Sequence, residues 1–254
     1  MSPRLDELEQ RATLLKQPQP VGPGTIVFTG DESARFTRSA ICGQGVIVQG
    51  MPPGTTVRWK LGSDITEARN ETCAEIIGDW IWFMDDDHAY ASDLLLRLLQ
   101  RNVDIVGPLC LRRIQPFLPT AAVDGDYMDI TRYGPEELVE VEHTGSSGML
   151  IRRRVIEAME APWFEMDHED DGRPVSEDVY FCRKARAAGF DIHVDMGARL
   201  GHMTAATVWP FHDESEDRWL TGFDVADGAK LWIGVSTPHT VAASVGGEQP
   251  PEVP

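Results

Sequence analysis

The sequence contains no long apolar run, and this limits the classes of protein to which it can belong. No stretch approaches the roughly 20 consecutive apolar residues that a membrane-spanning helix needs. The first residues, MSPRLDELEQR, also lack the apolar segment of a secretory signal peptide. With 254 residues, of which 42% are hydrophobic, the chain can bury an ordinary core. We therefore expect a soluble cytoplasmic protein with no integral membrane association.

Cysteine is scarce, and its spacing excludes two common kinds of scaffold. The four cysteines are far apart and no two of them form a C-x-x-C pair: Cys42, Cys73, Cys110 and Cys182. This spacing argues against a zinc knuckle and against a dense disulfide framework. We expect reduced thiols that are mostly buried.

Basic residues are also scarce relative to acidic ones. The 23 lysine and arginine residues face 41 aspartate and glutamate residues, which gives a formal net charge of −18. Such a surface repels phosphate backbones and anionic membranes at long range. We expect no stable nucleic-acid complex, although brief contact with DNA stays compatible with this charge. An acidic surface also suits a protein that gathers divalent cations.

The common nucleotide-binding loops are missing. The chain contains no G-x-x-x-x-G-K-[ST] sequence, which excludes a P-loop nucleotide hydrolase. No G-x-G-x-x-G sequence follows a predicted strand, which weakens a dinucleotide-binding interpretation.

Strand and helix patterns alternate along the chain. We expect strands over 25–30, 45–50, 56–62, 79–84, 103–109 and 190–195, helices over 64–78, 92–101 and 176–189, and a strand that passes into a helix over 147–160. The segment DWIWFM, 79–84, is apolar on both faces, as in a central strand of a covered parallel sheet. The pattern predicts an α/β fold whose mainly parallel sheet is flanked by helices, with ligands at the carboxyl ends of the strands.

The domain organisation is predicted to be simple. Residues 1–24 comprise an amphipathic helix over 4–16 and a Pro/Gly linker, residues 25–235 a single α/β domain, and residues 236–254 a loose tail rich in proline, glycine and small residues. Residues 111–143 are less regular and are predicted to form a lid or an insertion.

Three consecutive aspartates end the apolar strand in GDWIWFMDDDHAY. Asp85, Asp86 and Asp87 repel one another, and helix capping, worth about 0.3–1 kcal/mol, explains one or two of them. Ser92 or Asp93 already provides a separate cap for the next helix. Bound Mg²⁺ or Mn²⁺ would remove the repulsion, because these ions take carboxylate oxygens and substrate phosphates as ligands. The triplet therefore predicts a metal site for a nucleotide or a phosphorylated substrate.

Five segments together resemble glycosyltransferases with the GT-A fold that belong to or are similar to family 2. They are the D-x-D segment WIWFMDDDH (80–88), the Ala-Arg-Asn helix EARNETCAEIIGDW (67–80), the glycine-rich acceptor-side segment TGSSGMLIRR (144–153), the Glu-Asp helix with the next strand, SEDVYFCRKARAAGFDIHVD (176–195), and the late histidine in LGHM (200–203). The likeness is greatest to short stand-alone bacterial and bacteriophage enzymes. It implies a single GT-A domain in the cytoplasm, which is the host cytoplasm if a phage encodes the protein.

The resemblance implies a metal-dependent transfer of a sugar from a nucleotide-diphosphate donor to a hydroxyl acceptor. A UDP-sugar is favoured and a GDP-sugar is possible, and the acceptor is a glycan, a protein, a metabolite or a modified DNA base. Asp87 would bind Mn²⁺ or Mg²⁺ directly, and His202 would be the remote metal ligand. Asp85 would support the metal or hold the ribose. Asp86 is assigned, together with Asp85, to the site that binds the donor.

The resemblance also implies the catalytic pair. Asp178 would be the general base of an inverting reaction, with Glu177 binding the acceptor or orienting the loop. Acids in a first helical turn are also favourable without any function, so this pair alone leaves both interpretations open.

Four further residues are predicted at the donor. Arg69 and Asn70 would contact the nucleotide or diphosphate, although Arg69 could instead form a surface ion pair. Asp64 and Thr29 would hold the base and the ribose. The first strand reads TIVFTGDES and lacks the proline-containing start of family-2 enzymes, which leaves the base pocket open.

Three alternatives remain at this point. Retaining GT-A enzymes also contain Asp-Asp-Asp. A non-catalytic carbohydrate-binding protein would bind no nucleotide. A D-x-D phosphatase of the haloacid dehalogenase type would have threonine or valine where this chain has Ala89, and would carry the motif on its first strand.

Overall fold

The structure is a computed structural model that describes residues 22–30, 37–62, 64–113, 117–203, 207–224 and 230–234. The predicted helix over 4–16, most of the predicted linker and the predicted tail over 236–254 lie outside the described residues.

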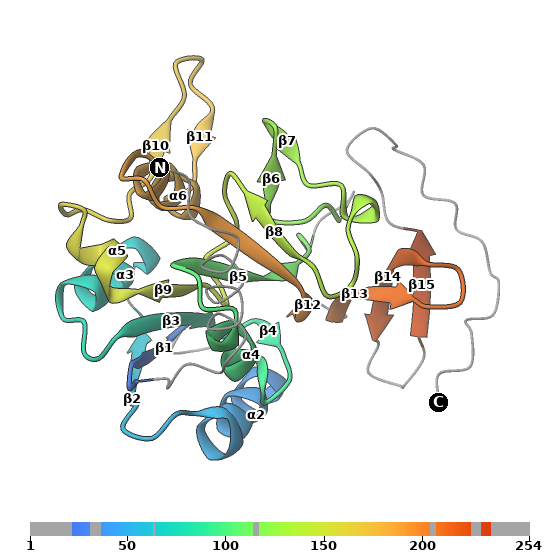
Figure 1. Cartoon of the computed structure of the whole chain (residues 1–254), viewed down its shortest axis with the longest axis horizontal. Coiled ribbons are helices and arrows are strands. Elements are labelled where there is room, and N and C mark those ends of the chain that lie inside the picture. The colour runs from blue at the N-terminus through green and yellow to red at the C-terminus, as the bar shows by residue number, and fades with distance from the viewer. Residues whose placement is uncertain are drawn as a thin grey trace, which may run out of the picture.

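One large sheet organises the chain (Figure 1). Its main path has the order β15-β14-β13-β12-β5-β9-β3-β1-β2, and β4 and β8 pair with β12 beside this path. The strands are β1 (Thr25–Gly30), β2 (Thr56–Leu61), β3 (Trp80–Asp85), β4 (His88–Ala89), β5 (Ile105–Cys110), β8 (Leu138–Val141), β9 (Leu150–Arg152), β12 (Ile192–Met203), β13 (Thr207–Asp213), β14 (Arg218–Asp224) and β15 (Lys230–Gly234). Two small hairpins lie outside the sheet: β6 (Ala122–Val123) with β7 (Asp126–Tyr127), and β10 (Asp167–His168) with β11 (Pro174–Val175).

The central part of the sheet is mainly parallel, which confirms the predicted fold class. Strand β1 pairs in parallel with β2 and β3, and β5 pairs in parallel with β12. Strand β9 enters between β3 and β5 and is antiparallel to both. The carboxyl ends of β1, β3, β5 and β12 therefore lie along one edge, where α/β sheets bind their ligands.

Helices cover both faces of this sheet because its central strand is apolar on both faces. Along β3, Trp80, Trp82 and Met84 belong to one buried cluster and Ile81 and Phe83 to the other. The first cluster also includes side chains of α4 (Leu94–Gln100) and η1 (Val46–Gly50), and the second includes side chains of α3 (Ile65–Ala74), α5 (Arg153–Glu157) and α6 (Glu177–Ala187). The helices expected over 64–78, 92–101 and 176–189, the strand and helix over 147–160 and the strand at 79–84 are thus present, with ends that differ from the prediction by a few residues.

The strand predicted over 45–50 is wrong. Helix α2 (Thr37–Gly45) continues directly into η1, a π-helical turn formed by Val46–Gly50. A short apolar run with β-branched residues cannot be distinguished by periodicity from a buried helical segment. Gly50 shows what decides the conformation, since a Cβ atom there would lie 1.9 Å from the carbonyl oxygen of Ser92. Close packing against the start of α4, rather than strand pairing, holds this segment.

The segments that flank the central sheet carry more structure than the sequence patterns indicate. Residues 111–143 contain β6, β7, the 3₁₀ turn η2 (Ile130–Arg132) and β8, which pairs antiparallel with β12. Strands β13, β14 and β15 extend the sheet beyond β12 as an antiparallel meander, visible at the right of Figure 1. None of these three strands was predicted from the sequence patterns.

A buried carboxylate joins α4 to β12 and so positions the end of β12. Asp195 is fully buried, and its oxygens accept hydrogen bonds from Arg97 Nε at 2.9 Å and from Arg101 Nη2 at 2.6 Å. Burial acts to raise the pKa of Asp195, but the hydrogen bonds from the two arginines outweigh burial and hold that pKa below its usual range. The register of β12 against β5 shifts between Asp195 and Arg199, and the strand then continues to His202.

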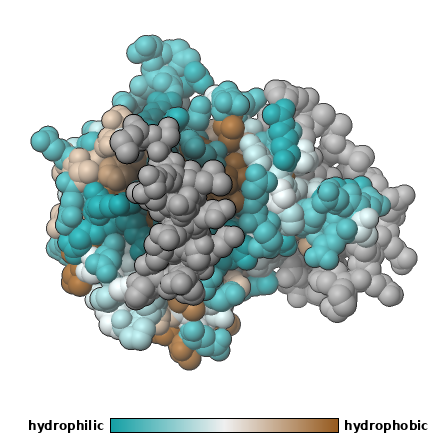
Figure 2. Space-filling view, in the orientation of Figure 1, coloured by the Kyte–Doolittle hydropathy of each residue, from teal (hydrophilic) through white to brown (hydrophobic). Residues whose placement is uncertain are grey.

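The described surface and thiols agree with the compositional analysis. Among the described residues that are visible in Figure 2, hydrophilic ones predominate. Cys73, Cys110 and Cys182 are buried, Cys42 is partly exposed, and all four are free thiols. Within the described ranges, none of the helices is both long enough and apolar enough to span a membrane.

Candidate active site

A cavity of about 620 Å³ opens at the carboxyl edge of the central strands. Its walls come from the ends of β1, β3, β5 and β12, from the first turns of α3 and α6, and from residues that follow β2 and β5. Of the predicted site residues, it brings together Thr29, Arg69, Asp85, Asp86, Asp87, Glu177, Asp178 and His202. The fold therefore gathers in one place residues that are up to 173 positions apart (29 to 202).

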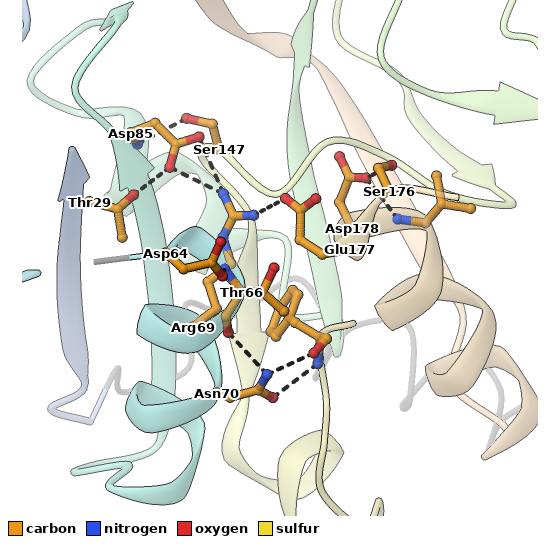
Figure 3. A network of polar contacts seen from close by, with 12 residues as sticks. Thr29, Asp64, Thr66, Arg69, Asn70, Asp85, Ser147, Ser176, Glu177 and Asp178 are labelled. Carbon is orange, nitrogen blue, oxygen red and sulfur yellow. Dashed lines mark hydrogen bonds and ion pairs between the residues drawn. The ribbon is translucent and has the colours of Figure 1, made fainter. Parts of the chain in front are cut away.

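Asp85, the last residue of β3, is held by its neighbours on adjacent elements. The Thr29 hydroxyl, at the end of β1, donates to Asp85 Oδ1 at 2.5 Å, because β1 and β3 pair in register at these two residues. The backbone N–H of Asp85 donates to Ser147 Oγ at 3.2 Å. These contacts orient the carboxylate toward the cavity wall formed by Arg69 (Figure 3).

Arg69 links the D-x-D strand to the Glu-Asp helix. Its Nη2 atom lies 3.2 and 3.3 Å from the two carboxylate oxygens of Asp85, and its Nη1 atom donates to Glu177. The residue is 1% exposed, and its guanidinium lies 5.8 Å from the centre of the Phe164 ring. Figure 3 shows the guanidinium between the two carboxylates. The side chain predicted to contact the nucleotide thus borders the cavity while its two Nη groups bind two carboxylates of the protein.

Asp87 has three basic side chains around its carboxylate. Arg113 Nη1 lies 2.8 Å from Oδ2, His88 Nδ1 lies 2.8 Å from Oδ1, and His202 Nε2 lies 3.3 Å from Oδ2. Burial acts to raise the pKa of Asp87, but hydrogen bonds from His202 and His88 outweigh burial and hold that pKa well below its usual range. Asp87 is therefore a carboxylate at neutral pH.

The two histidines are neighbours because of strand pairing. Strand β4 pairs antiparallel with β12, and His88 lies directly opposite His202. Their rings stack with centroids 4.5 Å apart. His202 Nδ1 lies 3.1 Å from the Leu111 carbonyl oxygen, which leaves Nε2 directed at Asp87. A carbonyl on one ring nitrogen is the usual way in which proteins orient a metal-binding histidine.

The donor set fits a divalent cation. Ligand atoms of Asp85, Asp87 and His88 all lie within 4.8 Å of one another. Carboxylate oxygens with an imidazole nitrogen suit Mn²⁺, and carboxylates suit Mg²⁺. Asp86 faces a different neighbour, since a Cβ atom built on Gly30 would lie 2.1 Å from Asp86 Oδ2. Its carboxylate thus lies against the backbone at the end of β1.

The acidic pair at the start of α6 lies across the cavity. Asp178 Oδ1 accepts hydrogen bonds from the Ser176 hydroxyl and from the Val179 backbone N–H, the latter at 2.8 Å. Both contacts use the same carboxylate oxygen and fix the side chain in the first helical turn (Figure 3). Burial raises the pKa of Glu177 above its ordinary value, while the charge of Arg69 opposes the shift.

Two predicted donor residues do not line the cavity. Asp64 is the N-cap of α3, and its Oδ1 accepts from the backbone N–H groups of Thr66 and Glu67 at 2.9 and 3.1 Å. The Asn70 side chain binds the backbone of the loop before β10: Nδ2 donates to the Phe164 carbonyl at 2.7 Å, and Oδ1 accepts from Trp163 N–H at 2.8 Å. Figure 3 shows Asn70 directed away from Asp85.

Several cavity residues escaped the sequence analysis. Arg113 and His88 contact Asp87, and Ser147 contacts both His88 and the backbone of Asp85. Lys60, Cys110, Thr120 and Ser146 also border the cavity. Ser146 and Ser147 belong to the glycine-rich segment 144–153, in which neither serine was assigned a role, whereas no local motif marks Lys60, Cys110, Arg113 or Thr120. The adjacency of His88 to the aspartate triplet was the one signal that could have identified it.

Fold and site together define a GT-A glycosyltransferase, with a sheet edge that presents a D-x-D carboxylate pair opposite a Glu-Asp helix. The family model described as "Glycosyltransferase like family 2" matches residues 24–222. The chain belongs to this family and is a glycosyltransferase.

A search of curated proteins gives no match. Among solved structures, A197 from STIV is similar, with a TM-score of 0.47, 12% sequence identity, and coverage of 86% of this chain and 98% of that chain.

Proposed function

We propose that this enzyme transfers a sugar from a nucleoside-diphosphate donor, with a UDP-sugar favoured over a GDP-sugar, to a hydroxyl acceptor, and that it inverts the anomeric carbon. The acceptor hydroxyl belongs to a glycan, a protein, a metabolite or a modified DNA base. One observation carries the proposal: a single cavity contains Asp85, Asp87 and His202 on one side and Glu177 and Asp178 on another.

The carboxylates at the end of β3 support a metal-dependent reaction. Asp87, Asp85 and His202 would hold Mn²⁺ or Mg²⁺, and His88 is close enough to join them. When bound, a divalent cation acts as a Lewis acid that stabilises charge on the departing diphosphate by several kcal/mol. The chain adds positive charge of its own, because Arg113 is half-exposed at the cavity and can exchange its contact with Asp87 for a phosphate oxygen.

The walls near β1 and β2 support nucleotide binding. Thr29, Gly30, Lys60, Gly62 and Ile65 border this part of the cavity. Gly62 lets a ligand approach the backbone closely, and Ile65 offers an apolar surface to a base. Lys60 forms an ion pair with Glu71 at 2.5 Å, which fixes its ammonium group at the edge of the site.

The start of α6 supports general-base catalysis. Asp178 accepts the proton of the acceptor hydroxyl as the hydroxyl oxygen forms its bond to the anomeric carbon, and the bond from that carbon to the diphosphate oxygen breaks. The Ser176 hydroxyl and the Val179 N–H hold the carboxylate in place for this transfer. Such proton transfer contributes typically about 10²–10⁴-fold to the rate. Glu177 binds Arg69 and so orients the turn that carries Asp178.

A donor screen tests the proposal. The full chain is incubated with Mn²⁺ and each of a panel of UDP- and GDP-sugars, and melting temperature and released nucleotide are measured, the latter by mass spectrometry. A donor at 100 times its Kd stabilises the folded state by about 2.7 kcal/mol, so a true donor raises the melting temperature. If no nucleotide sugar gives either a shift or released nucleotide, the proposal fails.

A pair of variants tests the role of Asp178. We expect Asp178→Asn to retain the donor-induced thermal shift and to lose about 10²–10⁴-fold in transfer rate. Asp191→Asn, an exposed aspartate before β12, serves as the matched control and should transfer at the wild-type rate. Equal turnover of Asp178→Asn and the control would exclude Asp178 as the base. Retention of anomeric configuration, measured by NMR of the product, would overturn inversion.

A further inference from the structure

A second group of potential metal ligands, His88, Cys110 and His202, lines the cavity, and strand register brings it together. Cys110, the last residue of β5, pairs with Leu200 of β12. His202 lies two residues beyond Leu200 and therefore on the same face of the strand. His88, on β4, lies directly opposite His202. Two imidazoles and a thiol thus converge from three neighbouring strands.

The spacing of these groups suits one metal ion. Ligand atoms of His88, Cys110 and His202 all lie within 4.8 Å of one another. Tetrahedral zinc, with bonds of about 2.0–2.3 Å, places its ligand atoms roughly 3.5 Å apart, so side-chain rotations that close about 1 Å complete the site. Asp87 contacts both imidazoles, at 2.8 Å from His88 and 3.3 Å from His202, and can supply the fourth ligand.

The surroundings also resemble those of a built metal site. His88 and Cys110 are buried, at 4% and 6% exposure. The Leu111 carbonyl lies 3.1 Å from His202 Nδ1, and the Ser147 hydroxyl lies 3.1 Å from His88 Nδ1. Hydrogen-bond partners of this kind orient the imidazoles of metal sites.

We propose that His88, Cys110 and His202 form a site for a thiophilic divalent cation, with Zn²⁺ as the ion it prefers, and that Zn²⁺ bound there competes with the catalytic cation. A thiolate with imidazoles selects zinc over manganese and magnesium, which favour oxygen ligands. The competition arises because both sites use His202 and Asp87. The competition rests on the proposed function, whereas the zinc site itself does not.

Cobalt substitution tests the site without any enzymatic assay. Co²⁺ is titrated into the full-length protein at neutral pH, and absorption is recorded. A cysteine ligand gives a thiolate-to-cobalt charge-transfer band in the near ultraviolet. We expect this band in the wild type, its displacement by Zn²⁺, and its loss in Cys110→Ser. Cys73→Ser and Cys182→Ser are matched controls, since both thiols are buried but lie elsewhere, and both should keep the band.

A second measurement needs no variant. Zn²⁺ should protect Cys110 of the wild-type protein from alkylation at least tenfold, read by mass spectrometry of the peptide that contains it, while Mn²⁺ should not. Absence of the cobalt band in the wild type, an unchanged band in Cys110→Ser, or equal alkylation of Cys110 with and without Zn²⁺ would each overturn the proposal. Zinc binding that Asp85→Asn abolishes and Cys110→Ser leaves unchanged would also overturn it, because the ion would then occupy the carboxylate site.

Competition between Zn²⁺ and the catalytic cation is measured separately, as inhibition of sugar transfer by Zn²⁺. Once a donor is known, transfer is measured in Mn²⁺ with increasing Zn²⁺, and each variant is compared with its own zinc-free rate. We expect Cys110→Ser to need at least tenfold more Zn²⁺ for half-inhibition than the wild type. Equal zinc sensitivity of the two proteins would refute the competition. A protein that shows the cobalt band but no transfer with any nucleotide sugar would refute the proposed function and leave the zinc site supported.

Discussion

Replacement of Arg69 by methionine is the most informative perturbation of this protein. Methionine keeps an unbranched side chain that can still pack against Phe164, but it removes the guanidinium that joins Asp85 to Glu177. The variant therefore leaves the carboxylates of Asp85 and Glu177 without the guanidinium group that pairs with both of them.

The size of the effect follows from burial. Arg69 is 1% exposed, whereas the side chains of Asp85 and Glu177 are 22% and 14% exposed. Breaking a buried ion pair by removal of one partner costs about 3–5 kcal/mol, and partial solvation of the two carboxylates favours the lower end. We expect a loss of about 3 kcal/mol in the free energy of unfolding. For a chain of this size that corresponds to a fall of roughly 6–12 °C in melting temperature.

Urea and thermal unfolding at pH 7, followed by circular dichroism, measure this loss. Arg58→Met provides the control, since Arg58 pairs with Glu75, whose side chain is 62% exposed, and such pairs contribute about 0.2–1 kcal/mol. The double variant Arg69→Met/Glu177→Gln should recover part of the stability, because it removes one of the unpaired charges.

A loss of less than about 1 kcal/mol in Arg69→Met, the range of the exposed control pair, would refute a stabilising buried ion pair at Arg69. Unchanged stability together with lost donor binding would show instead that Arg69 serves the nucleotide, as the sequence analysis predicts. A loss of stability that Glu177→Gln does not offset would locate the cost in packing rather than in unpaired charge.

Three further predictions concern other parts of the molecule. Asp87→Asn should lower the affinity for Mn²⁺ in calorimetry, reduce transfer at least about 100-fold, and also lower the melting temperature at neutral pH, because the carboxylate loses its contacts with Arg113 and the two histidines; full activity would exclude Asp87 as a ligand. Asn70→Ala should cost about 2–4 kcal/mol in urea unfolding, because backbone groups of residues 163–164 lose their partners, while the affinity for the donor is unchanged. Asp195→Asn should cost about 3 kcal/mol at pH 7. Because the pKa of Asp195 is lowered in the folded state, this cost should shrink as the pH falls below about 4, and a pH-independent cost would contradict the ion-pair explanation.

Local sequence patterns predicted the central sheet because the signals there are strong and short-range. The run at 79–84 is apolar on both faces, and in the structure β3 contributes to both buried clusters. The aspartates that follow it had to lie at a carboxyl edge, since a parallel strand that ends there presents its next residues at the ligand side. The same patterns could not distinguish a strand from a buried helical turn at 45–50, where packing against Ser92 decides.

The amino-acid sequence by itself determined the α/β class, the strand that carries Asp85–Asp87 and the family resemblance. Tertiary structure decided which side chains meet there. Arg69 binds two carboxylates rather than solvent, and His88 stacks on His202, because contacts between residues far apart in the chain depend on strand order and register. A shift of one residue in the pairing of β12 would turn His202 to the opposite face, and no local pattern encodes that register.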